Sequence, residues 1–364
     1  MKTNWNSGID YGFSIIKSMM LLLGQWPLQN NVIHTTQWVI IFIAGSLNVL
    51  NVLIESFKSC TVERDGLEIL RLIESCMHAW LNIFFSRIYK KKIAININAA
   101  IEDWSSTTME KESRMFFLYI LQAAIVDNST VNTWLFVIPS TCLYEGISYS
   151  TYKILFVIQV IQGSLVLISE NVYDSFFFSI TMHLCGQFEL LRMQFINVSQ
   201  QLYGKKYRGN VLGPLIKRHC QLIALANNIE DIFSIIILVR LLIISIVIAA
   251  SGFQLILALK FHDAVMITKT VTVLTTVLVQ LFVYSVVGGY LKSQMKKAAM
   301  SIYSCNWHCL PKKFMRTIIF VIMRSYQPVQ MLAGKFFSVN IETFMSILKS
   351  FLSYLSVLRV MIDA

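Results

Sequence analysis

Charged residues are scarce in this chain. They make up only 14% of its 364 residues, whereas soluble domains carry roughly 25%. Hydrophobic residues make up 55%, the mean hydropathy is +0.61, and the apolar residues come in long runs. This composition argues against a large soluble core and indicates a protein that crosses a membrane several times.

Signs of catalysis and of metal binding are lacking as well. No glycine-rich phosphate loop, catalytic-triad spacing or carboxylate pair stands out, so we expect neither an enzyme nor a cofactor. The seven cysteines are odd in number and scattered, which is not the pattern of a secreted disulfide framework. Cys305 and Cys309 flank His308, but zinc would need a fourth ligand and no second pair lies nearby.

Seven apolar stretches are long enough to cross a hydrocarbon core of about 30 Å, which needs about 20 helical residues. They cover residues 37–56, 67–88, 115–138, 155–186, 228–258, 265–291 and 337–361. The second is the weakest, because Glu68, Arg71 and Glu74 lie in its first two turns. The fourth continues as an amphipathic helix towards residue 203, beyond the membrane. The predicted fold is therefore an all-α membrane protein with seven transmembrane helices.

The basic residues predict the orientation of this bundle. They gather in the N-terminal arm and in the second, fourth and sixth loops, whereas the alternate loops hold only Lys58, Arg64, Lys153 and Lys260. Basic loops mark the cytoplasmic side, so we expect an intracellular N-terminus and an extracellular C-terminus. This orientation is opposite to that of G-protein-coupled receptors. The net charge is +11, but the basic residues flank apolar spans instead of forming one patch. This distribution argues against a nucleic-acid partner.

One seven-helix unit, residues 1–364, then divides into four parts. These are an N-terminal interfacial segment (1–36), spans one to six with a ligand cavity (37–291), a cytoplasmic anchor (292–336) and the last helix (337–364). Cys60 and Cys142 both fall on the predicted outer side, which leaves a disulfide between them open.

Small hydroxyl residues recur on one face of the last predicted helix. Ser346, Ser350, Ser353, Val357 and Met361 follow one another at helical spacings. A polar stripe closed by an apolar pair can line a water-filled pore in an oligomer, with the apolar ring as its gate. Tight helix packing is the alternative, because serines also occur at helix contacts in membranes.

Polar and aromatic residues within other spans are candidates for a ligand cavity. Polar side chains at membrane depth normally face protein or a cavity, and aromatic and apolar residues line pockets for small apolar molecules. The candidates are Asp127, Thr130 and Trp134 on one face of the third span, and His78, Leu81, Phe177 and Phe253 in the second, fourth and fifth. The alternatives are that the polar residues lie at a solvent-exposed outer end of the third span, and that the aromatic residues belong to an ordinary hydrophobic core.

An ordered set of residues near the C-terminus forms a longer signature. It comprises Tyr303, Trp307, Pro311, Arg324-Ser325, Pro328, Leu332-Ala333-Gly334-Lys335-Phe336, Ser353-Tyr354 and Val357-Leu358-Arg359. This signature resembles that of insect odorant receptors, with a hymenopteran character. Because the fourth loop carries no long insert, the chain resembles a ligand-tuned subunit rather than the shared co-receptor.

This resemblance implies much that spacing does not. Members of the family are odorant-gated, non-selective cation channels in the plasma membrane of olfactory neuron dendrites, surrounded by lipid. They are tetramers that usually include an odorant co-receptor subunit. The last helix lines the pore, with Val357 and Met361 at the gate, and a small volatile or apolar ligand binds in the outer half of the membrane. A gustatory-type receptor of the same superfamily is one alternative. A secondary transporter is another, but we see no internal repeats.

Overall fold

The computed structural model describes residues 7–29, 31–57, 66–105, 149–202, 212–304, 312–325 and 327–363. Several sequence predictions lie outside these residues. They are the third span (115–138) with Asp127, Thr130 and Trp134, the cysteines Cys60 and Cys142, and the group Cys305, His308 and Cys309.

Helices make up almost all of the described chain. They are α1 (Ser7–Leu22), α2 (Val32–Phe57), α3 (Gly66–Ile88), α4 (Lys90–Ser105), α6 (Tyr149–Leu202), α7 (Leu212–Phe261), α8 (Ala264–Ser304), α9 (Lys312–Ser325) and α10 (Ile341–Asp363). Two short strands, β1 (Leu332–Ala333) and β2 (Phe337–Ser338), pair antiparallel between α9 and α10.

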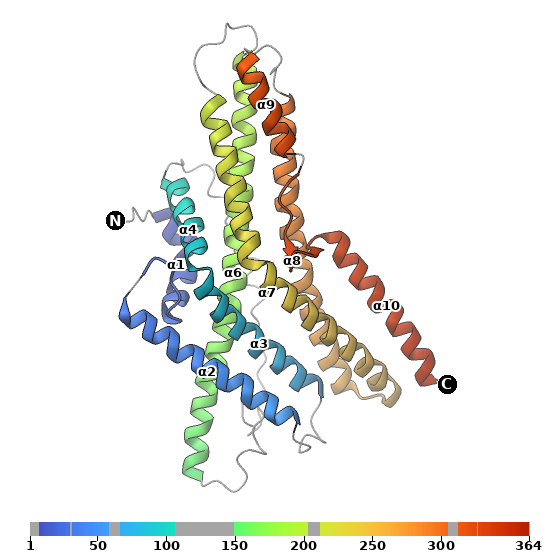
Figure 1. Ribbon diagram of the computed structural model, residues 1–364. Coiled ribbons are helices and arrows are strands. Elements are labelled where there is room, and N and C mark those ends of the chain that lie inside the picture. The colour runs from blue at the N-terminus through green and yellow to red at the C-terminus, as the bar shows by residue number, and fades with distance from the viewer. Residues whose placement is uncertain are drawn as a thin grey trace.

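Three long helices form the centre of the molecule. Figure 1 shows α6, α7 and α8 running side by side, with α2 and α3 on one side and α10 on the other. All three continue as single helices past their predicted spans. In α8 the buried face also continues, through Leu291, Met295, Ala298 and Ile302. This helical spacing explains why the helix does not stop at the membrane surface.

Five described helices are long and apolar enough to cross a membrane: α2, α6, α7, α8 and α10. The second predicted span forms α3, which carries the acidic and basic residues noted in the sequence. Within it, Arg71 binds the buried carboxylate of Glu74 at 2.6 Å. Such pairing reduces the cost of placing charges in this helix.

The main apolar core joins α1, α4 and α9 to the central helices. Phe13 of α1, Phe176 and Phe188 of α6, and Phe233 of α7 are all buried in it. The turn after α1 requires Gly24, whose φ is +65° and whose added Cβ would lie 2.8 Å from the carbonyl oxygen of His34. This turn sets α1 against α6 and directs the chain into α2.

The last helix begins later than the sequence predicts. Residues 337–338 belong to β2, and α10 starts at Ile341. The side-chain oxygen of Asn340 accepts a hydrogen bond from the Thr343 amide at 2.8 Å, which is the bond of a helix N-cap. The hairpin and this cap place the start of α10 against α7 and α8.

Candidate functional site

A cluster of polar side chains lies at membrane depth between α3, α6, α7 and α8. Its centre is Arg240 of α7, which is only 3% exposed. One terminal nitrogen of Arg240 donates to Asp174 Oδ1 at 2.6 Å and to His78 Nε2 at 2.9 Å. A charge buried in a membrane span is expensive unless it is paired, so Asp174 of α6 is the main reason that Arg240 is tolerated there.

The helix α8 completes the cluster through Tyr284. Its hydroxyl group donates to Asp174 Oδ1 at 2.5 Å and accepts from Arg240 at 3.2 Å. The guanidinium carbon also lies 5.1 Å from the centre of the Tyr284 ring, within the range of a cation–π contact. Three long helices are thus held together by one shared network.

The imidazole of His78 lies between Arg240 and a second carboxylate. A guanidinium group can only donate, so the ring of His78 accepts in its contact with Arg240. Its Nδ1 lies 3.6 Å from a carboxylate oxygen of Glu170. Glu170 and Asp174 are spaced four residues apart on α6, and both therefore face the cluster.

The cluster retains unused hydrogen-bonding capacity. Among the residues that the structure describes, the buried Nε and Nη2 atoms of Arg240 have no hydrogen-bond partner, and neither does the side-chain oxygen of Asn82 one turn after His78. Buried polar atoms are nearly always paired, so each exception calls for an explanation. Two donor nitrogens of one guanidinium suit an incoming oxygen acceptor.

Aromatic rings border the cluster on its α6 side. Phe177 stacks on Tyr284 with ring centres 5.1 Å apart and meets Phe233 edge-on at 4.8 Å. Tyr284 and Arg240 together link two of the predicted ligand residues, Phe177 and His78.

The other predicted ligand residues are not part of this cluster as described. Leu81 is half-buried on α3. Phe253 is 44% exposed on α7, next to the glycine where α10 approaches. The three candidates of the third span lie outside the described residues. The sequence analysis missed Arg240, although a lone arginine inside the apolar run 228–258 is itself a signal.

The last helix exposes the face that the sequence singled out. Ser346, Ser350, Ser353 and Val357 are all exposed. The opposite face packs: Phe344 meets Phe282 of α8 at 5.5 Å between ring centres, and Phe351 and Leu355 lie against Gly252 of α7. Met361 belongs to α10, but its side chain is outside the description.

A tight turn attaches the start of this helix to α7. Gly334 and Lys335 both have positive φ, +60° and +66°, and the Gly334 amide donates to the carbonyl oxygen of Ser234 at 2.8 Å. The Lys335 ammonium group binds Glu230 and, at 2.6 Å, Asp231. Partial burial opposes the charge, but these hydrogen bonds outweigh it and hold the pKa of Lys335 above its ordinary value.

The other side of the hairpin lies against α8. A Cβ added at Gly288 would be only 2.5 Å from the carbonyl oxygen of Val339. Gly288 is one turn after Tyr284, and Leu238, which touches Gly334, is two residues before Arg240. On both α7 and α8, the residues that contact the hairpin therefore lie within one helical turn of residues in the polar cluster.

Comparisons with known proteins agree on one family. The family model described as 7tm Odorant receptor matches residues 81–352. Odorant receptor 13a of Drosophila melanogaster is 28% identical over 207 residues, which is 53% of this chain and 49% of that protein. Odorant receptor 10 of Aedes albopictus is 22% identical over 217 residues, 59% of this chain and 57% of that protein. The chain thus spans about half the length of these relatives. Its resemblance to hymenopteran receptors in particular stays a prediction.

Solved structures match over nearly the whole chain. The insect olfactory receptor OR5 from Machilis hrabei has a TM-score of 0.73 at 12% identity, covering 97% of this chain and 99% of that chain. Its structure in complex with eugenol gives a TM-score of 0.72 over the same shares. This likeness confirms the predicted all-α, seven-helix membrane fold, whereas the orientation of the termini stays a prediction. Because the family model covers most of its length, this multi-pass membrane protein belongs to the insect 7tm odorant receptor family, which is a family of receptors and not of enzymes.

Proposed function

We propose that this chain is the odorant-binding subunit of a ligand-gated, non-selective cation channel, with α10 lining the pore. One observation carries the proposal: the serine stripe of α10 points directly away from the face that packs on α7 and α8. Two residues turn a helix by about 200°, so Ser346, Ser350 and Ser353 lie opposite Phe344, Leu348 and Phe351. Hydroxyl groups facing water along a central axis are better solvated than the same groups facing lipid.

The gate of this pore is an apolar ring near the outer end of α10. Val357 is 57% exposed and continues the stripe by one turn, and Met361 follows at the same spacing. Rings of apolar side chains can close a pore by excluding water. Several copies must meet to form such a ring, and a tetramer that includes the odorant co-receptor in the dendritic plasma membrane is the assembly we propose.

The proposed ligand is a small volatile molecule with an oxygen acceptor. His78 and Phe177 border the polar cluster, and the two unpartnered nitrogens of Arg240 supply donors there. OR5 of Machilis hrabei has been solved with eugenol, which is consistent with this ligand class. Most of the binding energy would come from apolar burial, at about 25 cal/mol per Å², while Arg240 would fix the orientation.

Coupling between ligand and gate would run through α7 and α8. Both helices contribute residues to the polar cluster. Within one turn of those residues, both also contact the hairpin that precedes α10. A ligand opens the channel only by binding the open arrangement more tightly than the closed one. A small shift of α7 against α8 would then be passed directly to the last helix.

The test is electrical recording from cells that express this chain with the co-receptor. Odorant-evoked cation currents that are absent with the co-receptor alone are the expected result, and silence across a broad panel would count against the proposal. The sharper comparison is Val357→Ala against Leu352→Ala. Both side chains are 57% exposed on α10, but Leu352 points about 140° away from Val357 around the helix. Only Val357→Ala should change conductance or basal opening.

A further inference from the structure

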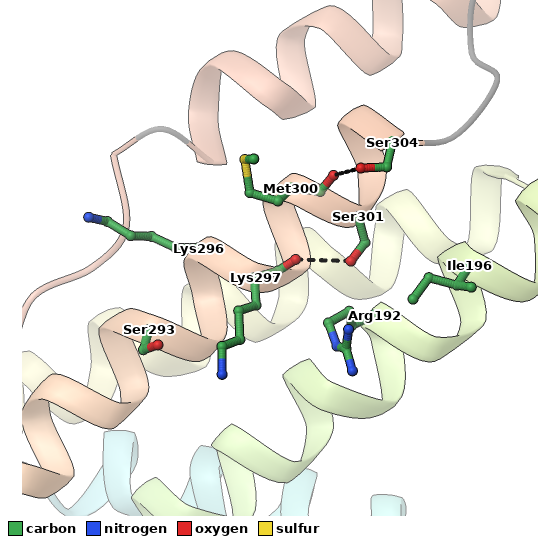
Figure 2. Close-up of a pocket in the computed structure, with 8 residues that line it drawn as sticks. All are labelled: Arg192, Ile196, Ser293, Lys296, Lys297, Met300, Ser301 and Ser304. Atoms are coloured by element: carbon green, nitrogen blue, oxygen red, sulfur yellow. Dashed lines mark hydrogen bonds between the residues drawn. The ribbon is translucent and has the colours of Figure 1, made fainter.

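A basic groove lies between the extensions of α6 and α8, away from both the polar cluster and the last helix. Its volume is about 410 Å³. Its lining consists of Arg192 and Ile196 of α6 and of Ser293, Lys296, Lys297, Met300, Ser301 and Ser304 of α8. In Figure 2, Arg192 and Lys297 extend into the space between the two helices, whereas Lys296 extends to the side.

The positive charge of this groove is only partly compensated. The carboxylate of Glu189 binds Nε of Arg192 at 2.9 Å and Nη2 at 2.6 Å, which orients the guanidinium group and leaves Nη1 for another acceptor. Lys296 and Lys297 form no ion pair with any residue that the structure describes. Two ammonium groups and one guanidinium nitrogen therefore remain available to an anion.

Two of the three serine hydroxyl groups in the groove already donate their hydrogen to the helix backbone. Ser301 donates to the carbonyl oxygen of Lys297 at 2.9 Å, and Ser304 donates to that of Met300 at 2.8 Å. The remaining donors are thus mostly charged nitrogens, which favour an anion with several oxygen atoms. Phosphate groups present such oxygens at higher charge than a single carboxylate does.

The basic end of the groove borders the predicted cytoplasmic membrane surface, and the rest of the groove extends away from the membrane. At a rise of about 1.5 Å per residue, Lys296, Lys297 and Arg192 lie roughly 8–9 Å beyond the ends of the predicted spans, whereas Ile196 and Ser304 lie about 15 and 20 Å beyond them. Lipid headgroups occupy about 5–8 Å on each side of the hydrocarbon core. Ile196 and Met300 add apolar surface to the lining beside these charges.

From these observations we propose that the groove binds the phosphorylated headgroup of a phosphoinositide in the cytoplasmic leaflet. Lys297 and Arg192 contact phosphate groups inside the groove, and Lys296 contacts the headgroup from the rim. Basic pockets between membrane helices on the cytoplasmic side are suited to such lipids. The inference rests on the predicted orientation of the bundle and is independent of the odorant that the receptor binds.

The experiment measures binding of dioctanoyl phosphatidylinositol bisphosphate to the purified full chain in detergent. Lys297→Gln is compared with Lys217→Gln, which removes an exposed lysine of α7 outside the groove. We expect Lys297→Gln to weaken binding by at least about tenfold, as for the loss of one charge-assisted hydrogen bond, and Lys217→Gln to leave it unchanged. Gel filtration verifies that both variants elute like the parent chain.

Four results would overturn the proposal. Equal weakening by Lys297→Gln and Lys217→Gln would mean general charge attraction instead of a site. Equal binding of dioctanoyl phosphatidylserine would remove the preference for a phosphorylated headgroup. If soluble inositol trisphosphate bound as tightly as the lipid, the groove would recognise a soluble inositol phosphate and not a membrane lipid. Absence of any phosphoinositide binding would contradict the proposal outright.

Discussion

Two neighbouring glycines of α8 provide a controlled test of the contact between the hairpin and α8. A Cβ added at Gly288 would lie 2.5 Å from the carbonyl oxygen of Val339, whereas a Cβ added at Gly289 would meet nothing within 4 Å. Val339 cannot simply turn aside, because its amide is hydrogen bonded to Met331 at 2.8 Å. Gly288→Ala should therefore displace the hairpin, and Gly289→Ala should not.

The magnitude follows from the overlap. Ordinary van der Waals contact begins at 3.4 Å, so the backbone oxygen of Val339 must move by about 0.9 Å. Overpacking of a close contact typically costs about 1–3 kcal/mol. Replacing glycine by alanine within a helix stabilises it by roughly 0.5–1 kcal/mol. That gain is common to both variants, so the difference between Gly288→Ala and Gly289→Ala reports the overlap alone.

The assay is the melting temperature of the solubilised receptor, followed by odorant-evoked current. A cost of about 1–3 kcal/mol lowers the melting temperature by several degrees, so Gly288→Ala should melt below Gly289→Ala. It should also respond more weakly to odorant, because the hairpin carries the last helix. If both variants melt together, or if Gly288→Ala melts higher, the close approach of hairpin and α8 is refuted.

Two further substitutions test the charged contacts. Arg240→Met leaves the Asp174 carboxylate in the membrane without its cation and should cost about 3–5 kcal/mol; the melting temperature should recover in part when Asp174→Asn is added, and no recovery would mean that the two groups are not coupled. Lys335→Gln leaves the buried Glu230 carboxylate unpaired and should destabilise the receptor by about 1–3 kcal/mol, whereas Lys217→Gln should change its melting temperature little.

Features set by one helix could be read from the sequence. The spacing of Ser346, Ser350 and Ser353 fixes a shared face whatever surrounds it, and the structure leaves that face exposed. The extension of α6 beyond its span was predictable for the same reason. The late start of α10 was readable too, because Asn340 precedes a helical run and asparagine is a common N-cap.

Features that join several helices could not be read in this way. Arg240 meets His78 across 162 positions of sequence, and no local pattern pairs them. The glycine at 288 is explained by the carbonyl oxygen of Val339 that lies against it, and the glycine at 334 by its positive φ and the side chain of Leu238. The signature around Lys335 was noticed as a motif, but its ion pairs with α7 depend on the folded hairpin.

The central claim is that the serine stripe of α10 faces the conduction pathway. Cysteine accessibility during odorant-evoked current tests it most directly, with Ser353→Cys compared with Leu352→Cys and with the parent chain. The two positions are adjacent and exposed, but they face directions about 100° apart. A charged thiol reagent applied outside should reduce current through Ser353→Cys while odorant is present and leave Leu352→Cys unchanged. Modification of Leu352→Cys with Ser353→Cys unaffected would contradict the account.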